Sequence, residues 1–255
     1  MLLLVDAGNT RIKWALADLR SPVLGHWFAG GAVIRENASG LADAWRGLAI
    51  SHALLSNVAG QGIRDILENA LLEALAPVRI TMEWFASVVS LAGVRNGYRN
   101  PAQLGCDRFA SAIGAHALFP GRPLIVATCG TATTVDAITA DGFFAGGMIL
   151  PGLGLMAASL AKNTAQLPQV AQHILVPQPF ADNTADAIVS GCIAAQAGAI
   201  ERAVAAHANR HGKVQCLLSG GAAATVAPYL SMPCEVVDNL VLLGLQAVAI
   251  NYVPC

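Results

Sequence analysis

The chain has 255 residues, of which 55% are hydrophobic and 12% charged, and its net charge is -1. That length supports a sizeable core in one large domain or two small ones. With near-neutral charge and no basic run, nucleic acid is not an expected partner. The mean hydropathy of +0.55 is high, and we expect a subunit interface to cover the excess apolar surface.

No membrane span or secretion signal is expected. The longest uncharged stretch, residues 142–161, has the length of a span. However, it holds five glycines and Pro151, so it is interpreted as a strand, a turn and a helix start. The N-terminus enters an apolar strand without a charged leader. The six cysteines include no C-x-x-C pair, which is typical of reduced thiols, so we expect a cytoplasmic protein.

The first predicted unit is a strand, a tight turn and a second strand. Residues 2–5 and 12–17 are apolar runs, and residues 6–10 form a polar turn between them. Asp6 is costly to bury without a partner, and Gly8 lets a ligand approach the backbone closely. The turn therefore predicts a phosphate cradle in which Asp6 holds Mg²⁺, directly or through water. An ordinary hairpin turn is the alternative.

Alternating strands and helices follow this hairpin. We expect strands at residues 51–58 and 78–85, and helices at residues 61–75 and 107–118. Such alternation favours an α/β fold built in layers.

Residues 105–108, with the sequence GCDR, open the alanine-rich helix. Asp107 either caps the helix and interacts with its dipole, or acts as a general base beside the guanidinium of Arg108. The preceding loop carries Tyr, Arg and Asn at residues 98–100, which suits recognition of a small polar acid.

The second half of the chain opens as the first does. Residues 124–131 align without a gap on residues 2–9, with Gly130 matching Gly8, and the match continues through the second strand. Two such units predict a duplicated α/β domain with a boundary near Pro120.

The rest of the second half supplies further strands, helices and turns. We expect strands at residues 143–150 and 214–218, and helices at residues 154–162 and 184–207. The last helix is uncharged on every side from residue 187 to residue 200, which predicts burial all round.

Three turns of small residues end strands in the two halves. They lie at residues 6–10, 128–131 and 219–222, and together they favour a nucleotide clamp between two lobes. No P-loop motif occurs in the sequence.

Two other sites were weighed. Residues 152–157 fit G-x-G-x-x-A, but Pro151 interrupts the turn and no acidic strand end follows at the distance of a ribose partner, which disfavours a dinucleotide site. His207 and His211 have the spacing of zinc ligands, but no third ligand is near, so we expect no metal there.

Five motifs in order resemble those of type III pantothenate kinases, in the acetate and sugar kinase/Hsp70/actin superfamily. They are D-x-G-N-T at residues 6–10, G-x-D-R at 105–108, G-T-x-T-T at 130–134, G-G-x-I-x-P-G at 146–152 and N-T-x-x-A-I-x-x-G at 183–191. The resemblance covers essentially the whole chain, and the pairing of the first two motifs is close to diagnostic.

The resemblance implies two ribonuclease H-like lobes, residues 1–119 and 120–255, with a central cleft. It implies transfer of the ATP γ-phosphoryl group to pantothenate, the first step of coenzyme A biosynthesis. It also implies Mg²⁺, a monovalent cation (K⁺ or NH₄⁺), and a homodimer whose subunits share active sites.

The resemblance assigns roles to individual residues. The ATP-binding residues would be Asp6, Ala7, Gly8, Asn9, Thr10, Arg11, Ile12, Lys13 and Thr131. Pantothenate would contact Tyr98, Gly105, Cys106, Asp107, Arg108 and Thr184, and Asp107 would accept the proton of its primary hydroxyl.

One position departs from the family. Many members have Asp where this chain has Thr128, at a monovalent cation site, so the resemblance does not carry K⁺ ligation over to this position. Two alternative functions stay open: another small-molecule kinase of the superfamily, such as a sugar or N-acetylhexosamine kinase, and a nucleotide-binding regulator without catalysis. The residues 105–108 argue against both.

Overall fold

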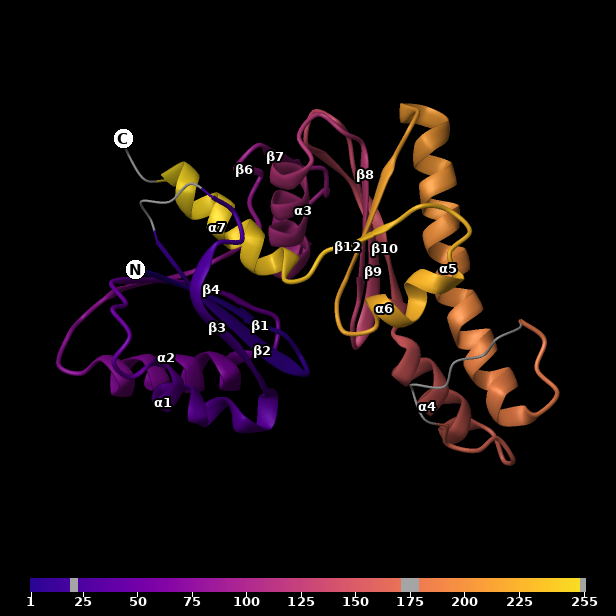
Figure 1. The fold of residues 1–255 in the computed structure, drawn as a ribbon, viewed down its shortest axis with the longest axis horizontal. Helices are drawn as coiled ribbons and strands as arrows, with labels where there is room; N and C mark the ends of the chain where they lie inside the picture. Colours follow the sequence, from indigo (N-terminus) through magenta and orange to yellow (C-terminus); the bar gives the residue numbers. More distant parts are fainter. Residues whose placement is uncertain (19–22, 171–178, 253–255) are drawn as a thin grey trace. The chain divides into compact units, whose positions relative to one another are not determined.

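The computed structural model describes residues 1–18, 23–170 and 179–252 (Figure 1). The chain divides into two compact units, Met1–Pro120 with Asn239–Cys255, and Gly121–Asp238. This division differs from the expected lobes of residues 1–119 and 120–255, because the C-terminal segment groups with the first unit. The reason is that helix α7 (Leu240–Tyr252) packs against helix α3 (Cys106–Leu118) of that unit.

The first unit contains a five-stranded sheet in the order β3-β2-β1-β4-β5. Strands β1, β2 and β3 are antiparallel neighbours, whereas β4 runs parallel to β1 and β5 parallel to β4. The strands are β1 (Leu2–Ala7), β2 (Arg11–Ala17), β3 (Trp27–Ile34), β4 (His52–Asn57) and β5 (Thr81–Trp84). A short hairpin, β6 (Ser90–Leu91) and β7 (Val94–Asn96), precedes α3.

The second unit repeats this topology in the order β10-β9-β8-β11-β12. Three antiparallel strands are again followed by two parallel ones. The strands are β8 (Leu124–Cys129), β9 (Ala132–Ile138), β10 (Phe143–Pro151), β11 (Gln215–Ser219) and β12 (Glu235–Val236). The repeated strand order confirms the duplicated α/β fold.

The opening hairpins of the two units differ by one residue at the turn. Ala7 pairs with Ile12 in the first, whereas Cys129 pairs with Thr133 in the second. The second turn is therefore one residue shorter. The gap-free sequence match holds for the first strands and is offset by one position in the second strands.

The third strands, β3 and β10, share a short sequence repeat. Residues 28–31 and residues 144–147 both read FAGG. Each strand has a register irregularity near this segment, opposite the last residues of the second strand. A β-bulge of this kind bends an edge strand and increases its twist.

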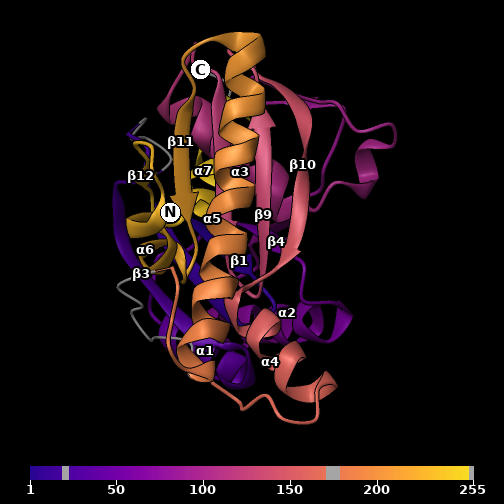
Figure 2. The ribbon, with the colours of Figure 1, turned by 90° about the vertical axis from the view of Figure 1, so that its right-hand side faces the viewer.

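Helices cover the sheets and supply the rest of the core. In the first unit α1 (Leu41–Trp45), which follows the 3₁₀ helix η1 (Arg35–Gly40), and α2 (Gln61–Leu75) pack beside strand residues. In the second unit α4 (Leu153–Asn163) packs on α5 (Thr184–His211), while α6 (Ala223–Val226) and η3 (Ala227–Tyr229) follow β11 (Figure 2). The 3₁₀ helix η2 (Pro101–Gln103) lies just before α3.

Helix α5 was expected to be buried all round, and within this chain it is not. Ile188, Ile193 and Ile200 are buried on its inner face, against a unit whose strands β8 and β9 it contacts. Its outer face exposes small residues, namely Ala187, Gly191, Ala194, Ala195 and Gly198. Among the described residues, α5 is the one helix long and apolar enough to cross a membrane. Its buried inner face is that of a core helix.

The residues of the two alternative sites lie in the second unit. Residues 143–152 run as an antiparallel strand into the start of α4, which is not the parallel βαβ arrangement of a dinucleotide fold. The ring Nε2 of His207 is buried 3.0 Å from the carbonyl oxygen of Ile138. No cluster of three or more metal-ligating side chains occurs in the ranges that the structure describes.

Candidate functional site

Asp6 lies near the carboxyl end of β1, between two polar residues of the neighbouring strands. Its register partners are Lys13 on β2 and Ser56 on β4. The turn after β1 is closed by the Gly8 N–H, which donates to the Arg11 carbonyl oxygen at 3.1 Å. The half-buried Asp6 carboxylate therefore sits at the base of an exposed turn formed by Asn9 and Thr10.

The start of α3 places a second carboxylate in the same unit. The Arg108 N–H donates to Asp107 Oδ1 at 2.8 Å, which fixes that side chain over the first turn of the helix. A Cβ at Gly105 would lie 2.7 Å from Asp107 Oδ1. Gly105 is therefore the residue that leaves room for this carboxylate.

Cys106 joins the start of α3 to the end of β4. Its Sγ lies 3.3 Å from Ser56 Oγ and donates to the Asn57 carbonyl oxygen at 3.5 Å. Asn57 in turn accepts from the Ala59 N–H at 2.8 Å and donates to the Gly60 carbonyl oxygen at 3.0 Å. Ser56 and Asn57 were not predicted as site residues, because only the parallel register of β4 with β1 brings them there.

The pKa values of both carboxyl groups are raised in this site. Burial, and then the charge of Asp107, raise the pKa of Asp6 to about 7, although Lys13 acts in the opposite direction. Burial also raises the pKa of Asp107, against the hydrogen bond and positive charge of Arg108. Two carboxylates that repel each other in a partly desolvated site are oxygen donors suited to a hard divalent cation. The residues present therefore fit Mg²⁺.

Tyr98 and Arg108 form one contact at the side of this site. The Arg108 guanidinium donates to Tyr98 Oη at 2.8 Å and lies 5.7 Å from the centre of the Tyr98 ring. The loop is held by Asn96, whose side chain accepts from the Tyr98 N–H at 3.0 Å and donates to the Pro101 carbonyl oxygen at 3.1 Å. Asn100 caps the following 3₁₀ helix, which gives it a structural role.

The second unit packs three turns against one another. The Gly152 N–H donates to the Thr131 carbonyl oxygen at 2.9 Å, and the Ala222 N–H donates to the Cys129 carbonyl oxygen at 3.0 Å. A Cβ at Gly152 would lie 2.7 Å from the Thr131 oxygen, and one at Gly220 (φ +91°) would overlap Cys129. Both glycines are needed for the close backbone approach that holds the turn carrying Thr131.

The position equivalent to Asp6 in this unit is Thr128. Its register partners are Thr134 on β9 and Ser219 on β11, which correspond to Lys13 and Ser56. The buried Thr134 hydroxyl has no hydrogen-bond partner in the described part of the chain. This cluster offers hydroxyl oxygens and no carboxylate, so its donors do not match the charge of the Asp6 site.

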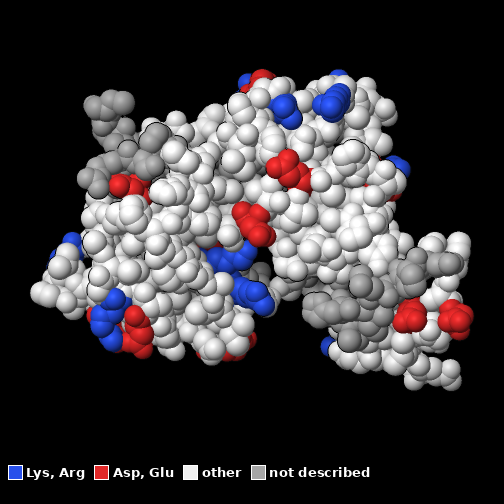
Figure 3. Space-filling model, viewed as in Figure 1, with Lys and Arg blue, Asp and Glu red and all other residues white. Residues whose placement is uncertain are grey.

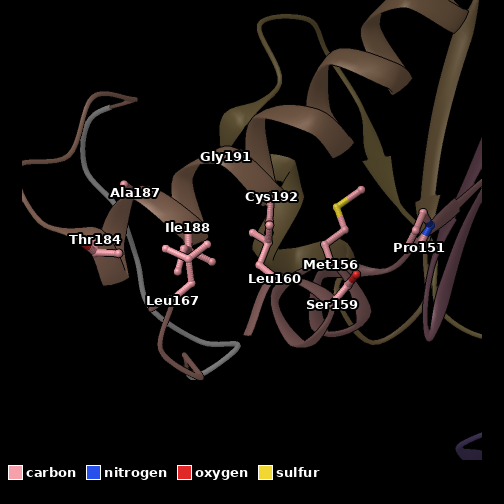
Figure 4. Close-up of a pocket in the computed structure, with 10 residues that line it drawn as sticks. All are labelled: Pro151, Met156, Ser159, Leu160, Leu167, Thr184, Ala187, Ile188, Gly191 and Cys192. Atoms are coloured by element: carbon pink, nitrogen blue, oxygen red, sulfur yellow. The ribbon is translucent and has the colours of Figure 1, made fainter. Parts of the chain in front are cut away.

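Thr184 begins α5 in the second unit. The helix is capped by Asn183, whose side chain accepts from the Asp186 N–H at 3.0 Å. Thr184 lines a groove of about 620 Å³ between α4 and α5, which Figure 4 shows. The other lining residues are mainly apolar and include Pro151, Met156, Leu160 and Ile188.

The carboxylate pair leads to a prediction about pH. The pKa of Asp6 is about 7 in the folded protein and 3.8 as a free side chain, so the folded state binds more protons between these values. The free energy of unfolding should therefore fall as pH rises from about 4 to about 7. Asp6→Asn should flatten that fall and raise the melting temperature of the ligand-free protein at pH 8.

Differential scanning fluorimetry across this pH range measures the effect. Asp43→Asn, at an exposed carboxylate paired with Arg46, is the control and should keep the slope of the parent protein. An unchanged slope in Asp6→Asn would contradict the raised pKa of Asp6.

Comparison with known proteins identifies the family of the chain. A family model described as type III pantothenate kinase matches residues 2–206. The type III pantothenate kinases of Janthinobacterium sp. (strain Marseille) and Herminiimonas arsenicoxydans are each 62% identical to this chain, over 100% of it and 99% of the relative. The type III pantothenate kinase of Aromatoleum aromaticum is 47% identical over 98% of each chain.

Solved structures share the fold at low sequence identity. A protein described as a 2-dehydro-3-deoxygalactonokinase from Sinorhizobium meliloti matches with a TM-score of 0.60 and 15% identity, over 100% of both chains. One described as an N-acetylmannosamine kinase from Listeria monocytogenes matches at 0.53 and 14%, over 98% of both. At these identities the likeness establishes the kinase-type α/β fold alone.

Proposed function

The chain belongs to the type III pantothenate kinase family, and from that premise we propose how its own residues carry out the reaction. The enzyme phosphorylates pantothenate with ATP, the first step of coenzyme A biosynthesis. The observation that carries the assignment of residues is the placement of Asp107 at the start of α3, where its Oδ1 accepts from the Arg108 N–H at 2.8 Å and Gly105 leaves room for the carboxylate.

Asp107 is the general base. It accepts the proton of the primary hydroxyl of pantothenate, and its raised pKa brings it closer to the pH at which proton acceptance is efficient. The hydrogen bond from the Arg108 N–H and the space left by Gly105 keep one oxygen oriented, so the other oxygen is available to the substrate. The product of the transfer is 4′-phosphopantothenate.

The residues from Asp6 to Lys13 hold the phosphates of ATP. Phosphoryl transfer depends mostly on positioning and charge neutralisation, and Mg²⁺ supplies much of that charge when bound. Asp6 holds the metal, directly or through water, and Lys13 lies beside it in the sheet register. The ATP-binding residues are Asp6, Ala7, Gly8, Asn9, Thr10, Arg11, Ile12 and Lys13, joined by Thr131 of the second unit.

Pantothenate contacts the start of α3 and the loop before it. Tyr98, Gly105, Cys106, Asp107 and Arg108 form this part of its site. Arg108 is bonded to Tyr98 and also orients Asp107 through its backbone, so it supports the site as well as carrying positive charge towards an acidic substrate. Cys106 is directed at β4 and anchors the helix.

The working unit is a homodimer in the cytoplasm, with Thr184 contributed to the partner's pantothenate site. The outer face of α5 exposes only small residues between residues 187 and 198, and Thr184 lines the apolar groove next to it. Ile149, Leu155 and Phe180 are also exposed in this unit. Figure 3, which shows α5 from its side, also has mostly uncharged residues at the surface, with the charged side chains in separate groups. Such a surface is stabilised by association at about 25 cal/mol per Å² of apolar area.

The cation dependence of ADP release tests the metal assignments. With pantothenate as acceptor we expect an absolute need for Mg²⁺ and only a shallow response to K⁺, because Thr128 and its neighbours offer neutral oxygens. Thr128→Asp should steepen the K⁺ response, and Thr139→Asp, at a half-buried Thr in the turn between β9 and β10, is the control that should not. A saturable and strong K⁺ requirement in the native enzyme would contradict this account of Thr128.

A further inference from the structure

Three residues of helix α3 lie on one face of the helix. Asp107, Ala110 and Gly114 follow one another at i, i+3 and i+7, so they lie on the same side of the helix. The proposed base therefore lies on the face of α3 that contacts α7 at Ala110 and Gly114.

That contact is a crossing with α7, which Figure 1 shows beside α3. A Cβ added to Gly114 would lie 2.6 Å from the Leu240 carbonyl oxygen and 2.8 Å from the Gly244 nitrogen. A Cβ added to Gly244 would overlap the Ala110 carbonyl oxygen. The two backbones thus touch without intervening side chains, and neither glycine can be replaced unless the helices separate.

The other neighbours of α7 are the strands of the site. It contacts β1, which carries Asp6, and also β2 and β4. Leu240, Leu242 and Leu245 of α7 are almost fully buried, so the helix is anchored there. Cys106 ties the first turn of α3 to the end of β4. Because α7 contacts the strands and also α3 further along that helix, the closeness of its crossing with α3 acts together with this anchor on the distance between α3 and β1.

We propose that Gly244, with Gly114, is a positioning residue for phosphoryl transfer, because their crossing sets the distance between Asp107 and Asp6. The proposal rests on the proposed role of Asp107 as the base. Glycine is disfavoured inside helices relative to alanine, so its presence on both sides of one crossing requires a reason, and the close approach supplies it.

The test replaces Gly244 with Ala and, separately, Gly114 with Ala. A displacement of α3 moves the base away from the reacting hydroxyl, and a misplacement of about 1 Å can lower the rate by about 10²-fold. We expect kcat for pantothenate to fall between about tenfold and a hundredfold, with the KM for ATP changed less than about threefold. Nucleotide binding, measured with a fluorescent ATP analogue, should stay near that of the parent protein.

Two controls separate positioning from loss of stability. Gly62→Ala alters a glycine in α2 with no atom near the added methyl group, and it should leave kcat unchanged. Leu245→Ala removes buried volume from α7 without forcing the helices apart, so it should lower the melting temperature while largely preserving kcat. A loss of kcat in Leu245→Ala equal to that in Gly244→Ala would overturn the proposal.

A double variant links the effect to the base. In an Asp107→Asn background, Gly244→Ala should cause little further loss of kcat, because the group that it displaces has already been disabled. If the double variant loses kcat by the product of the two single effects, Gly244 acts through something other than Asp107. That result would overturn the positioning role of Gly244 but not the role of Asp107 as the base. Full activity of Asp107→Asn by itself would instead refute the proposed base. If both glycine variants fail to fold, the proposal is wrong, since it requires α3 to shift within an intact unit.

Discussion

Replacing Asp107 with Asn is expected to lower kcat for pantothenate phosphorylation by about 10²-fold or more, with little change in the fold or in ATP binding. Asn keeps the size of the side chain and the oxygen that accepts the 2.8 Å hydrogen bond from the Arg108 N–H. It loses only the capacity to take a proton. The loss should therefore appear in kcat and not in the melting temperature.

The control addresses the competing role of Asp107 as a helix cap. Asp43 also lies in the first turn of a helix, α1, where its exposed carboxylate pairs with Arg46. Asp43→Asn should leave kcat unchanged, which would show that removing a carboxylate from the first turn of a helix is not enough to lower kcat. Steady-state ADP release with saturating ATP and pantothenate measures both variants. A kcat within about threefold of the native value in Asp107→Asn would remove this carboxylate from the mechanism.

Much of the fold could be predicted because periodicity and turn residues carry strong local signals. Helix α2 spans residues 61–75, as expected from its amphipathic pattern, and α5 begins at Thr184, as expected, with Asn183 as its cap. The uncharged stretch at residues 142–161 is a strand, a turn and a helix, as its glycines and Pro151 indicated.

Other elements were missed for physical reasons. Strand β3 is an exposed edge strand whose pattern does not alternate between buried and exposed residues, so period-2 reasoning does not find it. Helix α7 is apolar on all sides and short, which leaves no amphipathic period to detect. Its return to the first unit depends on the contact of Gly244 with α3, which no local pattern encodes.

Some residues of the candidate site could likewise be predicted from the sequence, and others could not. The turn of residues 6–10 and the residues 105–108 could be selected from sequence, because together they resemble two motifs of one kinase family, whereas each alone also fits an ordinary turn or helix cap. The roles of Ser56, Asn57 and Asn96 could not, since they depend on strand register and on a loop bond. The raised pKa of Asp6 likewise arises only when burial and the charge of Asp107 act together.

Subunits that are inactive alone are expected to recover activity when mixed, if each active site draws on two chains. Asp107→Asn disables the base in the first unit, and Thr184→Arg fills the start of α5 in the second with a long charged side chain. A mixed dimer then contains one site with native Asp107 from one chain and native Thr184 from the other. Random exchange of equal amounts makes about half of the dimers mixed, so activity should recover to roughly a quarter of the native level.

The matched control mixes Asp107→Asn with a chain that carries both substitutions. Its mixed dimers contain no site with both native residues, so activity should stay at the background of the single variants. The two mixtures have the same protein concentration and the same subunit exchange, and they differ in whether a mixed dimer can contain one complete site. A difference in activity between them therefore reports the sharing of active sites and not a general effect of mixing. Exchange is followed by mass spectrometry of differently tagged chains.

If exchange is complete and the first mixture stays inactive, each chain builds its own site. A monomer in sedimentation at assay concentration would refute the dimer itself, and the exposed face of Ala187, Gly191 and Gly198 on α5 would then need another explanation.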